Sequence, residues 1–154
     1  MNYIEVKGGT ISQQEKVHSM VEYCINKLMP RMRTLEIEVQ IKNIEKKEDA
    51  DGYCLRNSPR EFELEISNNQ GLRKMLETVA HEMVHVKQYA RNEMNDWVHD
   101  STREKYYKWK GTSVPEKTNY WDLPWEIEAN GMEVGLFVRW AKERGFDKQA
   151  WTQI

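Results

Sequence analysis

Hydrophobic residues recur at intervals of three and four positions in three segments of the chain, and this spacing predicts three helices. The segments cover residues 11–29, 71–93 and 124–144. The last segment also carries end signals, because Pro124 suits a first helical turn and Gly145 suits the residue that follows a helix. We therefore expect one helix near each end of the chain and one in its middle.

The pattern changes to strict alternation of hydrophobic and polar residues between the first two helices. Residues 35–41 and 61–67 alternate in this way, which is typical of half-buried strands, and residues 53–56 predict a shorter strand between them. Residues 95–121 are polar and aromatic and predict a long loop with room for a short hairpin. The expected fold is α+β: a small antiparallel sheet of about three strands packed with an N-terminal, a central and a C-terminal helix.

Length, charge and cysteine content narrow the possible classes of protein. The 154 residues suit one domain, covering 1–154, and we see no linker or repeat. The 23 basic and 25 acidic residues give a net charge of −2, which argues against autonomous nucleic-acid binding. The N-terminal residues hold no long apolar run, and Cys24 and Cys54 are too few for a disulfide framework. We expect a cytoplasmic protein with no membrane partner; the sequence carries no signal for its oligomeric state.

The central predicted helix contains the sequence HEMVH, an H-E-x-x-H motif that begins at His81. Residues four apart lie one turn apart on the same face of a helix, so His81 and His85 can bind one Zn²⁺. Glu82 lies beside the first ligand and can act as general base toward a water molecule on the metal. On a helical wheel both histidines lie opposite the apolar stripe, with Thr78 and Gln88 beside them.

A catalytic zinc ion usually takes three protein ligands, and the C-terminal helix offers the best third ligand. Glu126 lies on the apolar face of that helix, where a carboxylate is costly unless it meets a cation. Glu128 lies to the side, and Glu133 shares the inward face, where a structural ion pair is the alternative. Asn130 could hydrogen-bond a ligand. The rival third ligand is His99, in the long loop.

These motifs resemble those of gluzincin-type metallopeptidases, especially the small single-domain minigluzincins. That family pairs H-E-x-x-H with a glutamate on a later helix in an E-x-x-A-[DN] context, and EIEAN from Glu126 to Asn130 matches it. The elements upstream of the motif also resemble SprT-like domains, although those proteins place a third histidine about where His99 stands and often add a Cys-rich zinc ribbon, which this chain lacks. Arg91 replaces the third histidine of the metzincin pattern.

The resemblance implies a single zincin-like metallopeptidase domain over residues 1–154 with one Zn²⁺ per chain. It also implies a tyrosine or histidine that donates to the developing oxyanion, for which Tyr120 is the first candidate, followed by Tyr106, Tyr107 and His99. In such folds the edge strand over the metal helix pairs with an extended peptide, and we assign this role to residues 60–67.

The function that these residues predict is hydrolysis of peptide bonds by a zinc-activated water molecule, with Glu82 as general base and a peptide or protein as substrate. Two alternatives stay open. One is a catalytically silent zinc-binding module or regulator of the same fold. The other is a SprT-like, nucleic-acid-associated protease.

Overall fold

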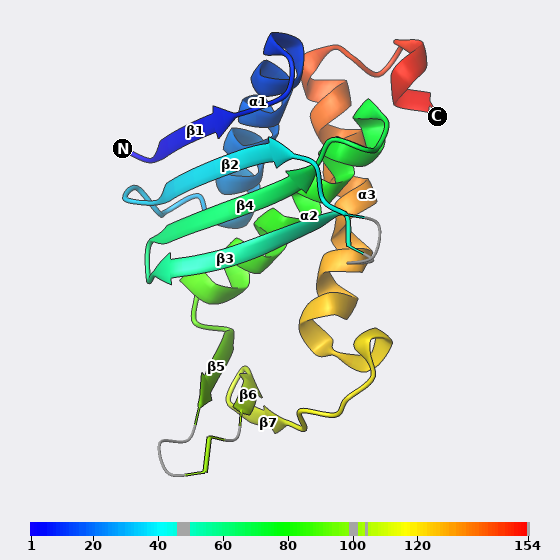
Figure 1. Cartoon of the computed structure of the whole chain (residues 1–154). Coiled ribbons are helices and arrows are strands. Elements are labelled where there is room, and N and C mark those ends of the chain that lie inside the picture. Colours follow the sequence, from blue (N-terminus) through cyan, green and yellow to red (C-terminus); the bar gives the residue numbers. More distant parts are fainter. Residues whose placement is uncertain (46–49, 99–101, 104, 154) are drawn as a thin grey trace.

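The computed structural model of the chain describes residues 1–45, 50–98, 102–103 and 105–153. Figure 1 shows a sheet covered on one side by helices, a second small sheet below it, and a long C-terminal helix at the side. The α+β class is confirmed. In chain order the elements are β1 (Tyr3–Lys7), α1 (Ile11–Leu28), β2 (Glu36–Lys42), β3 (Gly52–Ser58), β4 (Glu61–Ser67), α2 (Leu72–Ala90), β5 (Met94–Val98), β6 (Lys105–Trp109), β7 (Thr112–Val114), the 3₁₀ turn η2 (Tyr120–Asp122), α3 (Pro124–Arg144) and the 3₁₀ turn η3 (Ala150–Gln153).

The main sheet has four strands in the order β1-β2-β4-β3 and is mixed rather than antiparallel. Strand β2 pairs in parallel with both β1 and β4, and only the β3–β4 hairpin is antiparallel. Strand β4 runs parallel to β2 because the chain first forms β3 at the outer edge of the sheet and then returns as β4 between β3 and β2. The expected antiparallel sheet of about three strands was therefore wrong in its pairing, and it lacked β1. A separate antiparallel sheet, β5-β6-β7, occupies much of the predicted loop over 95–121.

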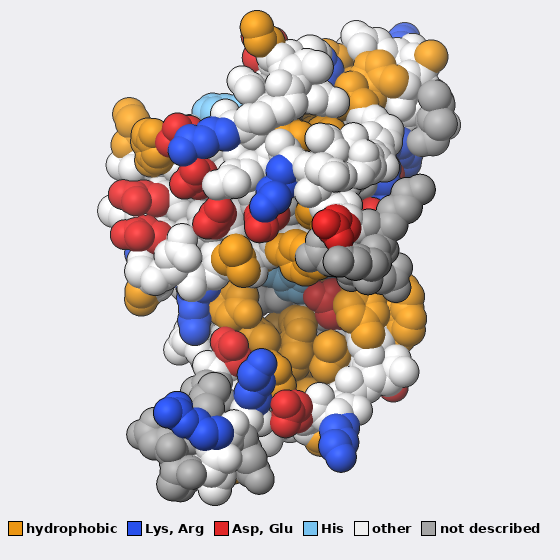
Figure 2. All heavy atoms as spheres, viewed as in Figure 1, with side chains coloured by type: hydrophobic (Ala, Val, Ile, Leu, Met, Phe, Trp, Pro, Cys, Tyr) orange, Lys and Arg blue, Asp and Glu red, His pale blue; other side chains and the backbone are white. Residues whose placement is uncertain are grey.

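The hydrophobic core lies between the main sheet and the helices. Alternate residues of β2 and β4 point into it: Ile37, Val39 and Leu64 are fully buried. Helix α2 packs against the sheet, α1 and α3, so it is the central element of the fold (Figure 1). The opposite face of the sheet carries glutamates of β2 and β4 and stays polar (Figure 2). Among the described residues, no helix has both the length and the apolar character needed to span a membrane.

Candidate metal centre

The two histidines of the motif lie on the face of α2 that points away from the main core. Val79, Met83 and Val86 fill the opposite, fully buried face, as the helical wheel predicted. The side chains of His81 and His85 keep 13% and 12% of their surface exposed. Their rings lie edge to face with centroids 5.0 Å apart, so both can approach one point.

Glu126, in the first turn of α3, meets both histidines. Its Oε1 lies 2.6 Å from Nε2 of His85, and its Oε2 lies 3.3 Å from Nε2 of His81. One ligand atom from each of the three residues lies within 4.8 Å of the others, and this group could hold a metal ion. Metal–ligand bonds of about 2.0–2.1 Å in a tetrahedral site separate ligand atoms by about 3.3 Å, so the spacing fits with small adjustments.

The other candidate ligands are placed differently. Glu128 points away from the histidines and bonds to Lys87 at 2.6 Å and to Gln88 at 3.2 Å. His99, the rival third ligand, lies outside the described residues. Glu133 does approach the site: its Oε1 is 3.5 Å from Nδ1 of His81, so the ion pair that the sequence allowed is formed with one of the candidate ligands.

Each histidine therefore presents Nε2 to Glu126 and Nδ1 to another partner. The partner of His85 is Gln88, whose Oε1 lies 2.8 Å from Nδ1. Burial alone would lower the pKa of His81, but its hydrogen bonds to Glu126 and Glu133 outweigh burial and raise that pKa to about 10. Burial likewise opposes the charge on Glu126, yet bonds from both histidines hold its pKa well below the ordinary range. A metal ion bound here must displace the protons that these nitrogens carry.

Glu82 is buried, with 6% of its surface exposed, and it does not belong to the ligand group. Burial raises the pKa of its carboxyl group, because the charged form loses hydration, while His85 and His81 act in the opposite sense. A carboxylate held in this way has a stronger affinity for a proton than one in water. Glu82 lines the same cavity as His81, His85 and Glu126.

A cavity of about 470 Å³ lies in front of these residues. It is bounded by α2, by the start of α3 and by residues 50–54, which include the first residues of β3. In Figure 2 the molecule is hollowed near its middle, where histidine and acidic side chains border the opening and hydrophobic side chains line its lower side. The edge strand that packs over α2 beside this cavity is β3. The assignment of this role to residues 60–67 was wrong, because β4 lies inside the sheet between β2 and β3.

Tyr120 borders the cavity from η2, directly before α3, and is 45% exposed. Its hydroxyl interacts with Glu126 and accepts a hydrogen bond of 3.3 Å from Asn130. Asn130 thus supports Tyr120 rather than a metal ligand. Burial is the main cause that raises the pKa of Tyr120 to about 12, so its hydroxyl keeps its proton at neutral pH.

The other aromatic candidates lie elsewhere. Tyr107 stacks on Trp125 with ring centroids 5.7 Å apart, and Tyr106 points to the opposite face of β6. Neither belongs to the described residues that line the cavity.

No protein-family model, curated protein or solved structure matches the chain. The interpretation of the site therefore depends on the geometry of its own residues. Sequence reasoning placed Gln88 on the histidine face but gave it no role, and it missed β3 as the wall of the cavity. The position of Gln88 on the helical wheel, beside the histidines, could have indicated a role for it at the site. The position of β3 in the sheet could not be predicted in this way, because it depends on strand order.

Proposed function

We propose that the chain is a zinc-dependent metallopeptidase that hydrolyses peptide bonds. The observation that carries the proposal is that the Glu126 carboxylate, from a separate helix, meets both histidines of an H-E-x-x-H motif. Two imidazoles and one carboxylate form the donor set of a catalytic zinc site that leaves a fourth position open. His81, His85 and Glu126 are the proposed ligands of one zinc ion per chain.

A zinc ion in this site would polarise the scissile carbonyl group and bring the pKa of a water molecule close to neutrality. Glu82 lines the same cavity and takes the proton of that water. It then passes the proton to the leaving amine. Tyr120 donates its hydroxyl hydrogen to the oxygen on which negative charge develops.

The walls of the cavity support a peptide as substrate. Strand β3 pairs with β4 on one side, and in the described part of the chain no strand pairs with its other side. An extended peptide can therefore add to this edge through backbone hydrogen bonds, next to Glu82 and the ligands. This addition would hold a peptide bond beside the catalytic carboxylate without requiring a particular side chain.

The first experiment measures metal content. Inductively coupled plasma mass spectrometry of the wild-type protein should find about one zinc ion per chain. His81→Ala, His85→Ala and Glu126→Gln should lose most of it, and Glu128→Gln should keep it. Full occupancy in both histidine variants would contradict the ligand assignment. Loss of zinc from Glu128→Gln but not from Glu126→Gln would exclude Glu126 as third ligand.

The second experiment measures cleavage of a peptide library by Glu82→Gln, which keeps the size of the side chain but removes the basic oxygen. It should fold, bind zinc and lose about 10²–10⁴-fold in turnover, the usual contribution of a general base. Unchanged turnover would refute the mechanism. A wild-type protein that binds zinc and cleaves no library member would favour the alternative of a silent zinc-binding module.

A further inference from the structure

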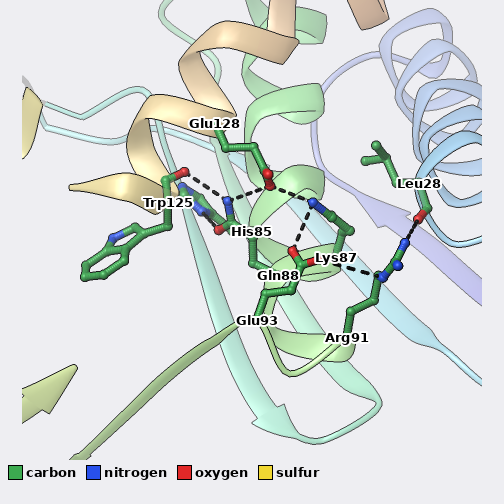
Figure 3. Close-up of polar contacts among 8 residues, drawn as sticks. All are labelled: Leu28, His85, Lys87, Gln88, Arg91, Glu93, Trp125 and Glu128. Carbon is green, nitrogen blue, oxygen red and sulfur yellow. Dashed lines mark hydrogen bonds and ion pairs between the residues drawn. The ribbon is translucent and has the colours of Figure 1, made fainter. Parts of the chain in front are cut away.

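Gln88 lies three residues after His85 on α2 and is 1% exposed, so its amide must find partners inside the protein. It has them at both ends, as Figure 3 shows. Its Nε2 donates to the backbone carbonyl of Trp125 at 2.9 Å and to Oε1 of Glu128 at 3.2 Å. Its Oε1 faces Nδ1 of His85 at 2.8 Å.

These contacts fix the orientation of the amide and, through it, the proton on His85. The carbonyl of Trp125 and the carboxylate of Glu128 can only accept hydrogen bonds, so the NH₂ group must face them. The Gln88 oxygen then faces the imidazole and requires a hydrogen on Nδ1. Because Nδ1 carries that hydrogen, Nε2 is the ring nitrogen left to bind a metal ion, and it is the one that points toward Glu126.

The same amide also holds the other side of the site. Trp125 and Glu128 flank Glu126 in the first two turns of α3. Glu128 is held in turn by Lys87, whose Nζ lies 2.6 Å from Glu128 and 2.9 Å from Glu93 (Figure 3). Lys87 therefore ties α3 to α2 without contacting a proposed ligand, whereas Gln88 ties α3 to His85 itself.

We propose that Gln88 is a positioning residue of the metal centre. It sets the tautomer and ring orientation of His85, and it holds the start of α3 so that Glu126 meets the same metal ion. The inference rests on the metal site of the proposed function and does not require that the protein cleave peptides. Partners of this kind usually contribute about 10–100-fold to metal affinity.

The test compares three variants in zinc affinity, measured by competition with a chromophoric chelator. Gln88→Met keeps the length of the side chain but loses every hydrogen bond, so zinc affinity should fall about 10–100-fold. Gln88→Glu keeps an acceptor for His85 and loses both donors, so it should fold less stably yet hold zinc more tightly than Gln88→Met. The matched control is Lys87→Met, which removes the adjacent interhelical ion pair and should change zinc affinity less than about threefold.

A second readout separates a positioning role from a general loss of packing. The visible spectrum of the cobalt(II)-substituted protein reports ligand geometry, and it should change in Gln88→Met while Lys87→Met matches the wild type. Equal zinc affinity in Gln88→Met and wild type would overturn the inference, as would equal losses in Gln88→Met and Lys87→Met. If Gln88→Met does not fold, weak zinc binding by folded Gln88→Glu overturns it. A wild-type protein that binds no zinc overturns the metal site as well; absence of cleavage with normal zinc binding affects only the proposed function.

Discussion

Strand β3 lies close to α2 at Gly52, and alanine at this position should destabilise the protein. A Cβ atom placed there would lie 2.8 Å from Cγ2 of Thr78, 3.0 Å from the backbone oxygen of Glu65 and 3.4 Å from Cγ of Glu82. The separation from Thr78 is shorter than two carbon atoms tolerate, and the contact with the Glu65 oxygen, which belongs to the paired strand β4, is tight. The expected cost is steric and comes from this close packing of strand on helix.

The magnitude follows from the size of the overlap. Relaxed contacts between carbon atoms begin at about 3.5 Å, so Thr78 and β3 must separate by about 0.7 Å. Overpacking of this kind costs about 1–3 kcal/mol. Replacement of glycine by alanine also restricts the unfolded chain, and this effect raises the free energy of unfolding by about 0.4–1 kcal/mol. We expect a net loss of about 1–2 kcal/mol in the free energy of unfolding, or roughly a 5- to 30-fold change in the folding equilibrium.

Urea denaturation of chelator-treated protein gives this free energy for Gly52→Ala and its controls. Gly131 lies exposed inside α3 with nothing within 4 Å of a Cβ, so Gly131→Ala should stabilise by up to about 1 kcal/mol. Thr78→Ser removes the offending methyl group and keeps the hydroxyl, which bonds to Lys74 at 2.8 Å and to Gln70 at 3.1 Å. The double variant should therefore lose less stability than the sum of the single losses. The reasoning fails if Gly52→Ala is as stable as Gly131→Ala.

Three further predictions concern thiols, the core and the metal. Half-buried Cys54 should react with iodoacetamide at a rate that rises about tenfold per pH unit above pH 7, because burial raises its pKa and keeps the thiolate scarce. Burial raises the pKa of Cys24 to about 12, so this thiol should react only after unfolding, and labelling of Cys24 before Cys54 in mass spectra of the native protein would contradict the prediction. In denaturant titrations, Leu64→Ala should lower the free energy of unfolding by about 2–5 kcal/mol, because Leu64 is fully buried. Leu55 is 45% exposed, so Leu55→Ala should lower it by less than about 0.5 kcal/mol, and equal losses would contradict the burial pattern. Zinc at 100 times its dissociation constant should stabilise the wild type by about 2.7 kcal/mol in thermal unfolding, and a similar gain in His85→Ala would show that zinc binds elsewhere.

The helices were predictable because their signals are local. The limits of α3, Pro124–Arg144, were predicted to the residue, since a proline in the first turn and Gly145, with φ of 80°, mark its ends. Helix α2 stops at Ala90, earlier than the predicted residue 93. The chain turns there to start β5, with Asn92 at a φ of 60°, and the spacing of hydrophobic residues does not predict that turn.

Strand pairing was not predictable in the same way. Alternation along β2 and β4 shows which side chains face the core, and the alternate hydrophobic residues of both strands are buried. It says nothing about which strand lies next to which, and both parallel and antiparallel pairing bury the same residues. Without the strand order, the role of the edge strand was assigned to residues 60–67, whereas β3 is the strand at the edge. The contact of Gly52 with α2 was not predictable for the same reason, because it depends on the position of β3 in the sheet.

The candidate metal centre was partly predictable, and it lies between these two cases. His81 and His85 share a face by spacing alone, whereas Glu126 was found through an energetic argument: a carboxylate on an apolar helix face needs a cationic partner. Gln88 follows a similar rule, since its buried amide finds its donor partners on α3. Apolar burial between α2 and α3 is not directional and leaves their register open. The polar contacts of Gln88 are directional, and they favour the register in which Glu126 meets the histidines, so the side chain that aligns the start of α3 with His85 also helps to assemble the candidate metal site.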